Sequence, residues 1–354
     1  MHLRLGRTRA PRAVVAVAAL AVTAGVAGLS TRAAAAPTAA ASHYTVGLFG
    51  DMPYGDEGRA EYPNLLADIN AHNVAFSIFD GDLKAGSDGP CDNALYTRSL
   101  DWFNSLQQPL VWLPGDNDWT DCWGRYGPGT GGFAPLERLR HEREVFAPGS
   151  QSLGQTTLTL TRESSEGGAY APYRENVRWR RGPVVFLGLN VQGSNDNLPH
   201  AGVDGETRGP AAIAHQAAEH AARLAANVHW LQEGFAYARS VGAKGVLVAW
   251  QADPNFNNEQ HLTDPLEYDG LVPYVDALRE QVTGFPGQVV LVHGDSHYFK
   301  VDKPLADAAG HVLTNFTRVE TFGSINTNWV RATIDASDPN VFEFEPMIVP
   351  SSVG

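Results

Sequence analysis

Cysteine is nearly absent from this 354-residue chain, which carries only Cys91 and Cys122. Neither has a second cysteine or a histidine close by in the sequence, which argues against a cysteine-rich zinc site. In an exported protein a single even pair predicts a disulfide bond, and two free buried thiols are the alternative. Both cysteines follow predicted strand ends, so a bridge between them would join two loops on one face of the fold.

Positive charge is also scarce. The chain has 26 Lys and Arg residues against 39 Asp and Glu, for a formal net charge of −13. Five of the arginines lie in the first 36 residues, which contain no acidic residue, so the remaining chain carries −18. This balance argues against a nucleic-acid-binding surface, which needs a basic stripe.

Four further patterns are missing. There is no internal repeat and no linker rich enough to divide the chain. There is also no Gly-x-Ser-x-Gly elbow, so a serine α/β hydrolase ranks well below the other interpretations. No segment after the first 36 residues is apolar over a length that could span a bilayer.

A long apolar run does occur at the N-terminus. Four arginines precede the Ala- and Val-rich residues 13–29, and small residues follow up to Ala36-Pro37. This order predicts a secretory signal peptide over residues 1–36, with a membrane anchor as the alternative. We therefore expect a secreted protein with no stable membrane insertion after cleavage. Residues 37–43 are expected to be disordered and residues 44–350 to form one domain.

Short apolar runs alternate with helical patterns in the next part of the chain. Residues 44–49, 74–79 and 109–113 are predicted strands, and residues 61–71 and 94–105 are predicted helices. The strands stop at Gly50-Asp51, Asp80-Gly81-Asp82 and Gly115-Asp116. The alternation predicts an α/β fold with parallel strands and crossover helices. Because functional residues gather beyond the carboxyl ends of such strands, Asp51, Asp82 and Asp116 are expected at one edge.

The rest of the chain contains further elements of both kinds. Helices are predicted over residues 136–146, 211–240 (with a break near Asn227 as the alternative) and 271–282. Strands are predicted over residues 158–161, 169–173, 177–179, 184–189, 245–250 and 289–292, and antiparallel strands over 316–322, 329–334 and 342–344. Two of these strands also end in polar residues. Gln251 and Asp253 follow one, and His293, Asp295 and His297 follow the other.

Carboxylates gathered in one crevice repel one another unless a countercharge is present. Lys84 is the one lysine offered at these strand ends, so divalent cations are the natural partners. Two of them about 3.5 to 4 Å apart form the usual clamp for attack on phosphate esters. A single Gly-Asp is more often only a turn and helix cap. Three on successive strands, with Gly-Asp-x-His on a later one, favour a metal site.

The ordered motifs resemble a known family. Asp51, Gly81-Asp82, the Gly-Asp-Asn-Asp of residues 115–118 and the Gly-Asp-Ser-His of residues 294–297 resemble the calcineurin-like metallophosphoesterase superfamily. Its motifs read Asp-x-His, Gly-Asp, Gly-Asn-His-Asp/Glu, a single His after a strand, and Gly-His-x-His. The resemblance implies a four-layer α/β/β/α sandwich with mixed central sheets. It also implies a metal-dependent phosphoric ester hydrolase in which two divalent metal ions activate a bridging water.

The resemblance assigns metal ligands residue by residue. Asp51 looks like the first ligand of metal one, Asp82 like the bridging carboxylate and His297 like the closing histidine of metal one. The other positions differ in type, because Asp116 replaces an Asn and Asp295 replaces a His. The single histidine becomes Gln251, or Trp250 if the register slips by one, and Pro53 stands where the family has its first histidine.

Metal two would therefore be held by oxygen donors from Asp82, Asp116, Gln251 and Asp295. Such a set suits Mn, Mg, Ca or Fe better than Zn. The sequence leaves open which of Gln251, Asp253 and His293 faces the metals.

The departure at Asn117 bears on catalysis, because the family has a histidine there that assists the leaving group. A neutral amide can donate a hydrogen bond to phosphate but cannot act as a general acid. His293 is a candidate replacement, with a core position as the alternative. Lys84, Tyr54 and Asp118 are predicted to bind substrate.

These motifs predict a secreted metal-dependent phosphoesterase that acts on a small-molecule phosphate ester. The alternative is a catalytically degenerate protein of the same fold that binds a metal and a ligand without turnover. Asn117 and Pro53 motivate it. The substrate, the preference for monoesters or diesters, the metal identity and filling of both sites, and the oligomeric state are left open.

Overall fold

The computed structural model describes residues 42–123, 132–199, 205–256 and 270–351. The predicted signal peptide and most of the N-terminal segment predicted to be disordered lie outside these residues, although His43 already belongs to the first strand. The strands of the described residues form two sheets. One has the order β12-β11-β1-β2-β3 and the other the order β4-β5-β6-β7-β8-β10-β9.

The five-stranded sheet is built on three parallel strands, β1 (His43–Phe49), β2 (Ser77–Phe79) and β3 (Leu110–Trp112). Helices α1 (Gly55–Ala71) and α2 (Asn93–Phe103) connect them. β11 (Trp329–Asp335) pairs antiparallel with β1, and β12 (Phe342–Met347) pairs antiparallel with β11. The predicted parallel strands with crossover helices are therefore confirmed in this half of the fold.

The seven-stranded sheet is mixed. β6 (Val184–Gly188), β7 (Gly245–Ala249), β8 (Gln288–His293) and β10 (Phe316–Glu320) run parallel to one another. β4 (Thr161–Arg162), β5 (Val177–Arg181) and β9 (Lys300–Asp302) add antiparallel pairs at the edges. The strand over residues 316–322 was predicted to be antiparallel. Its counterpart β10 pairs parallel with β8, so the prediction is wrong for this pairing. The short strand β9, which does pair antiparallel with β10, has no apolar pattern in the sequence.

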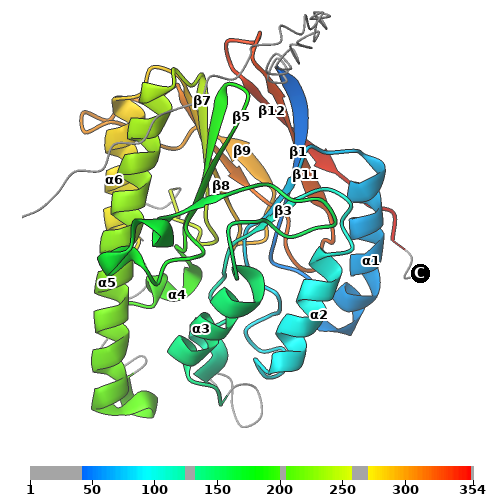
Figure 1. Ribbon diagram of the computed structural model, residues 1–354, viewed down its shortest axis with the longest axis vertical. Helices are drawn as coiled ribbons and strands as arrows, with labels where there is room; N and C mark the ends of the chain where they lie inside the picture. The colour runs from blue at the N-terminus through cyan, green and yellow to red at the C-terminus, as the bar shows by residue number, and fades with distance from the viewer. Residues whose placement is uncertain (1–41, 124–131, 200–204, 257–269, 352–354) are drawn as a thin grey trace, which may run out of the picture. The chain divides into compact units, whose positions relative to one another are not determined.

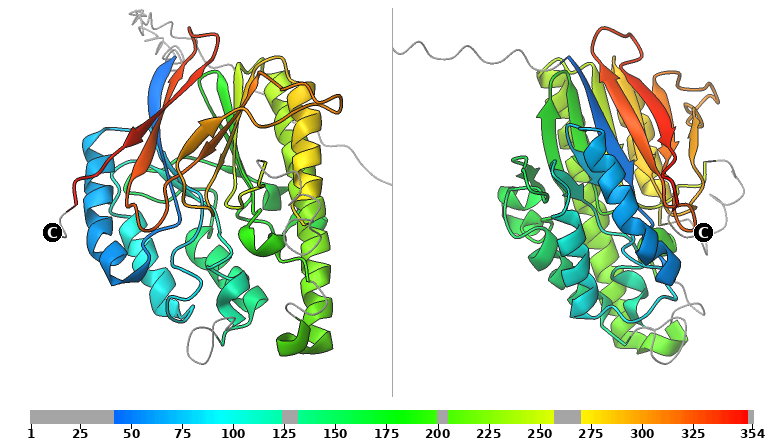
Figure 2. Two further views of the ribbon diagram at one scale, coloured as in Figure 1. Left: turned by 180° about the vertical axis from the view of Figure 1, so that it is seen from behind. Right: turned by 90° about the vertical axis from the view of Figure 1, so that its right-hand side faces the viewer.

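Helices cover the outer face of each sheet, as Figures 1 and 2 show. α5 (Gly205–Ser240) and α6 (Val272–Thr283) pack on the seven-stranded sheet. α1 and α2 pack on the five-stranded sheet, and α3 (Pro135–Phe146) lies against α2. The facing sides of the two sheets bury a third apolar cluster. The layers thus run helices, sheet, sheet, helices, and the predicted four-layer α/β/β/α sandwich is confirmed.

The central strands read as continuous apolar runs because both of their faces are buried. In β7, Val246 and Val248 face α5 and α6, whereas Leu247 faces the other sheet. Burying one such side chain stabilises the fold by roughly 1.5 to 3 kcal/mol. This packing fixes the strands rigidly and with them the positions of the residues that follow their carboxyl ends.

Several predicted elements differ from the observed ones. α1 begins six residues before its predicted start, with Asp56 and Glu57 in its first turn, where negative charge is favourable. Residues 169–173 do not form a strand, because the 3-10 turn η3 (Gly168–Tyr170) begins there after two glycines with positive φ. α5 does not break at Asn227, whose buried amide accepts from Asn176 and donates to the Asn190 carbonyl.

The remaining short elements lie in the connections between the strands. They are η1 (Thr120–Trp123), η2 (Glu163–Glu166) and α4 (Gly193–Asp196). None of the helices in the described ranges is both long enough and apolar enough to cross a bilayer.

Candidate active site

Four aspartates meet where strands from both sheets end. Asp51 follows β1, Asp82 follows β2, Asp116 follows β3 and Asp295 follows β8. The amide nitrogen Nε2 of Gln251 lies 3.3 Å from Asp82 Oδ2, 3.2 Å from Asp116 Oδ1 and 3.1 Å from Asp295 Oδ1. The backbone N–H of Asp295 donates to Asp51 Oδ2 at 2.9 Å. We call Asp51, Asp82, Asp116 and Asp295 the carboxylate cluster.

The backbone at this cluster adopts an unfavourable conformation. Asp51, Asp82, Asp295 and His297 all have positive φ angles, of 51°, 68°, 75° and 63°. Residues other than glycine rarely adopt such angles, and each instance costs on the order of 1 to 3 kcal/mol. Strain of this kind concentrates at functional sites, where the rest of the fold enforces it.

Two glycines allow the carboxylates to approach the backbone closely. A Cβ atom at Gly294 would lie 1.9 Å from Asp51 Oδ2, and one at Gly115 would lie 2.0 Å from Asp82 Oδ1. Both contacts are far shorter than atoms tolerate, so a side chain at either position would displace a carboxylate. The Gly-Asp pairs of this chain therefore serve the packing of the cluster as well as the turns.

Tyr54 and Asn117 hold Asp82 from the more exposed side. The Tyr54 hydroxyl donates to Asp82 Oδ2 at 2.8 Å and lies 3.4 Å from Asp51 Oδ1. Asn117 donates to both oxygens of Asp82, from Nδ2 at 2.6 Å and from its backbone N–H at 3.1 Å. Asn117 Nδ2 also lies 3.3 Å from the Tyr54 hydroxyl. The structure thus brings Tyr54, predicted to bind substrate, and Asn117, predicted at the catalytic position, against the predicted bridging carboxylate.

His297 is oriented toward Asp51. Its Nδ1 lies 2.9 Å from the Ser324 carbonyl oxygen, which can only accept, so Nδ1 carries the hydrogen. Its Nε2 lies 3.5 Å from Asp51 Oδ1. The side chain is 29% exposed. A histidine held through one ring nitrogen by a backbone carbonyl, with the other aimed at a carboxylate, has the orientation that metal-binding histidines adopt.

The carboxylate cluster carries negative charge that few neighbours balance. Burial, followed by the charges of neighbouring aspartates, raises the pKa of Asp82 and of Asp116 well above the usual range. Burial and the charge of Asp51 raise the pKa of Asp295 to about 7. The buried Lys84 also faces this charge, and burial lowers its pKa. A site with this excess of negative charge attracts cations.

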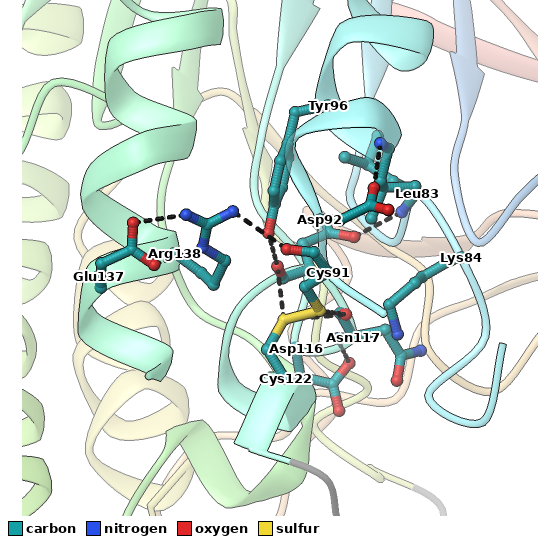
Figure 3. Close-up of a disulfide and its surroundings, with 12 residues drawn as sticks. Leu83, Lys84, Cys91, Asp92, Tyr96, Asp116, Asn117, Cys122, Glu137 and Arg138 are labelled. Atoms are coloured by element: carbon teal, nitrogen blue, oxygen red, sulfur yellow. Dashed lines mark hydrogen bonds and ion pairs between the residues drawn. A yellow bond between two sulfur atoms is a disulfide. The ribbon is translucent and has the colours of Figure 1, made fainter. Parts of the chain in front are cut away.

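Lys84 donates from Nζ to the Ala85 carbonyl at 3.1 Å. Figure 3 draws Lys84 together with Asn117 and the disulfide. The predicted bond between Cys91 and Cys122 is confirmed, with 5.7 Å between their Cα atoms. It joins the loop after β2 to η1, so it restrains the loop that carries Asn117.

Asp118 does not line a substrate pocket, and that prediction is wrong. The side chain is fully buried and accepts hydrogen bonds from the backbone N–H groups of Asp82, Leu83 and Gly115. Since both of its oxygens are engaged with the backbone, Asp118 fixes the loops after β2 and β3 to each other.

Of the three candidates left open by the sequence, Gln251 is the one that faces the carboxylate cluster. The Asp253 carboxylate instead accepts from Ser296 Oγ and from the backbone N–H of Asn255. His293 is fully buried, and its Nε2 lies 3.9 Å from Asp253 Oδ1. Its Nε2 is directed toward Asp253 and not toward the carboxylate cluster, so the predicted catalytic role of His293 does not fit this position.

Three residues at the site were not predicted. Ser194 Oγ donates to Asp116 Oδ2 at 2.8 Å and lies 3.0 Å from Asp121 Oδ1. Asp80 is buried next to Asp51 and accepts from Thr321 Oγ1 at 2.9 Å. Asp80 stands within a strand-end motif, so its acidity was a usable signal, whereas Asp121 lies in η1. Ser194 lies in a turn with left-handed residues that has no local pattern.

Across the described ranges, no three Asp, Glu, His or Cys side chains form a group that could hold a metal ion. The contacts of the cluster give a physical reason. The NH2 groups of Gln251 and Asn117 lie between the carboxylates and donate to them. Asp51 and His297 offer suitable ligand chemistry, but the oxygens around Gln251 are engaged by neutral donors.

No family model matches the chain, and no curated protein matches it. Among solved structures, the chain is similar to a dimetal phosphatase from Danio rerio, at 12% identity over 87% of this chain and 99% of that one, with a TM-score of 0.49. It is also similar to GAP50, described as the anchor in the inner membrane complex of Plasmodium, at 7% identity over 88% and 90% of the two chains, with a TM-score of 0.44. A 5'-nucleotidase from Candida albicans is similar at 9% identity over 85% of this chain and 50% of that one, with a TM-score of 0.41.

Proposed function

We propose that this protein is a secreted, cation-dependent phosphoesterase that hydrolyses a small-molecule phosphate ester. The observation that carries the proposal is the meeting of the carboxylate cluster with His297, whose Nε2 faces Asp51 Oδ1 at 3.5 Å. The cluster lies beyond the carboxyl ends of parallel strands, where α/β folds bind their ligands. The disulfide supports export, which the signal peptide predicted over residues 1–36 would direct.

The donors around Asp51 fit a divalent cation. Asp51 and His297 would hold it, with the charge of the neighbouring Asp82 beside them, and oxygen-rich ligands favour Mn, Mg, Ca or Fe over Zn. The tight backbone approach at Gly294 and the positive φ angles keep the donors in place. When bound, the cation supplies a water of lowered pKa and withdraws charge from the phosphoryl oxygens.

The residues of the chain itself position the substrate. The Tyr54 hydroxyl orients Asp82 through the 2.8 Å hydrogen bond. The amide of Asn117 and the ammonium of Lys84 are hydrogen-bond donors at the same edge, and both suit phosphate oxygens. Asn117 has no proton to transfer to a leaving group, so the chain's own contribution to bond cleavage is orientation and charge.

The space for the rest of the substrate lies beside Tyr54. A cavity of about 620 Å³ is lined there by Tyr54, Met52, Ile325 and Ile348, together with acidic residues at the start of α1. Small-molecule pockets commonly have volumes of about 300 to 1,000 Å³. A cavity of this size next to a phosphate site supports a small ester as the substrate.

The test of this function is the Asp82→Asn variant. Turnover of p-nitrophenyl phosphate and of bis-p-nitrophenyl phosphate with Mn²⁺ should fall about 10- to 100-fold, since the partners of metal ligands are worth that much. Asp101→Asn, on the exposed side of α2, is the matched control and should keep wild-type turnover. Equal turnover in the two variants would defeat the proposal.

A second candidate is a protein of the same fold that binds a cation and a ligand without turnover. The observation that favours it is the saturation of Asp82 by the neutral amides of Asn117 and Gln251. Elemental analysis combined with a broad panel of phosphate monoesters and diesters distinguishes the two candidates. Bound cation with no turnover on any ester supports the second.

A further inference from the structure

The side-chain amide of Gln251 has one orientation that its contacts allow. Its Oε1 accepts from the backbone N–H of Gly193 at 2.6 Å, and its Nε2 faces the carboxylates. Turning the amide over would set the NH2 against an N–H and the oxygen against three carboxylate oxygens. Both changes are repulsive, so hydrogen bonding fixes the NH2 toward the cluster.

The rest of the residue is equally fixed. Gln251 is fully buried at the end of β7, and its backbone bonds to Val191 on one side and Gly294 on the other. A Cβ at Gly81 would lie 2.7 Å from Gln251 Cγ, so the side chain packs directly on that backbone. The amide therefore has no room to swing away from the carboxylates without moving β2.

The Nε2 atom stands among three of the four carboxylates, at 3.1 to 3.3 Å from Asp82, Asp116 and Asp295. An amide nitrogen has no lone pair to offer a metal, but its two hydrogens are attractive to carboxylates. Other donors occupy further oxygens of the same residues. Ser194 Oγ donates to Asp116 Oδ2, and the backbone N–H of Asp253 donates to Asp295 Oδ2.

The surroundings of Asp51 and His297 are different. Asp51 Oδ1 faces His297 Nε2 at 3.5 Å and the Tyr54 hydroxyl at 3.4 Å, both longer than a good hydrogen bond. The half of the site at Asp51 Oδ1 and His297 Nε2 is thus held by long side-chain contacts. The other half is closed by hydrogen-bond donors that belong to the protein.

We propose that the Gln251 amide takes the place of the second divalent cation, so that the site holds a single cation, at Asp51 and His297. This inference rests on the proposed function and corrects one part of the sequence prediction, in which Gln251 was an oxygen ligand of metal two. Three carboxylates around a neutral amide keep more negative charge than three carboxylates around a cation. That charge weakens phosphate binding on the Gln251 side of the site.

The test is the number of Mn²⁺ ions bound per chain, measured by elemental analysis after gel filtration and by titration calorimetry. We expect about one in the wild type and about two in Gln251→His, which replaces the donor with a nitrogen ligand. Electron paramagnetic resonance should show isolated Mn²⁺ in the wild type and a coupled pair in the variant. Gln151→His, at an exposed position away from the site, controls for an added histidine and should stay at one.

The possible outcomes separate the two proposals. Two coupled ions in the wild type would overturn the inference and leave the phosphoesterase proposal standing. No bound Mn²⁺ in the wild type would overturn the cation-dependent function itself. One ion in both the wild type and Gln251→His would show that Gln251 is not what excludes the second. If the histidine variant does not fold, Gln251→Ala should still gain a second, weaker Mn²⁺, and a stoichiometry of one would count against the inference.

Discussion

The charge on the carboxylate cluster should be visible as a pH dependence of stability in the cation-free protein. Burial and the charge of Asp51 raise the pKa of Asp295 from 3.8 to about 7. The folded protein then keeps a proton that the unfolded chain releases above pH 4. Because the folded state binds more protons, the free energy of unfolding falls as pH rises through this window.

The size of the effect follows from the shift. Each pKa unit corresponds to about 1.4 kcal/mol, so a shift of about three units removes about 4 kcal/mol of stability between pH 4 and pH 8. Asp295→Asn abolishes the titration. The variant also loses one of the two hydrogen bonds that the carboxylate accepts. This loss changes its unfolding free energy at every pH, but it does not change how the unfolding free energy depends on pH.

The assay is urea unfolding followed by tryptophan fluorescence, in chelator, at several pH values from 4.5 to 8. The difference in unfolding free energy between Asp295→Asn and the wild type should change by about 3 to 4 kcal/mol in favour of the variant as pH rises. Saturating Mn²⁺ should restore the unfolding free energy of the wild type at pH 8. It should raise the unfolding free energy of Asp295→Asn by a smaller amount. The unfolding free energy of Asp101→Asn should change with pH in the same way as that of the wild type. If that of Asp295→Asn also does so, the cluster does not carry uncompensated charge and the reasoning is refuted.

Two further predictions concern a neighbouring loop and a distant carboxyl. Asn117 cannot protonate a leaving group, so turnover should depend steeply on leaving-group acidity. Asn117→His should raise the hydrolysis of alkyl phosphate esters about 100-fold and that of p-nitrophenyl esters little, and equal gains on both would contradict this role. Glu163 is fully buried, and burial raises its pKa from 4.5 to about 8, so its contribution to stability is lost as pH rises from 4.5 to 8. Glu163→Gln should therefore be about 1 to 3 kcal/mol more stable than the wild type at pH 7.5 and not at pH 4.5 in urea unfolding. A variant that is less stable at both pH values would show that the ionised carboxylate is not destabilising.

The aspartates of the site could be predicted from the sequence because strand ends are local features. An apolar run that stops at Gly-Asp places its aspartate beyond a strand, and parallel pairing brings such ends together. Asp51, Asp82 and Asp116 follow from this rule without any long-range information. Asp295 follows from the same rule, although it belongs to the other sheet.

The side-chain orientations could not be predicted, because distant contacts decide them. Gln251 presents its NH2 rather than its oxygen because the N–H of Gly193, 58 residues away, binds the oxygen. Asp118 is buried because three backbone N–H groups of two loops converge on it. His293 was placed near the site by its neighbours in sequence, but strand alternation turns it toward Asp253.

The helix predicted over residues 211–240 is present, but the break considered near Asn227 is absent for a related reason. A polar residue in an apolar stripe reads as an interruption, whereas in the fold its amide binds Asn176, Asn190 and Tyr274 inside the core. Hydrophobic periodicity shows where polar residues occur, but it does not show which hydrogen-bond partners a buried polar side chain will find. The same limit applies to Ser194, whose role arises from a left-handed turn.

Asp51 and His297 are proposed to hold a cation at the edge where the sheets end. Anomalous diffraction from crystals grown with Mn²⁺ would locate this cation. We expect one strong peak within ligand distance of Asp51 and His297, and no second peak among Asp116, Gln251 and Asp295. A map without a peak at Asp51 and His297 would contradict this proposal.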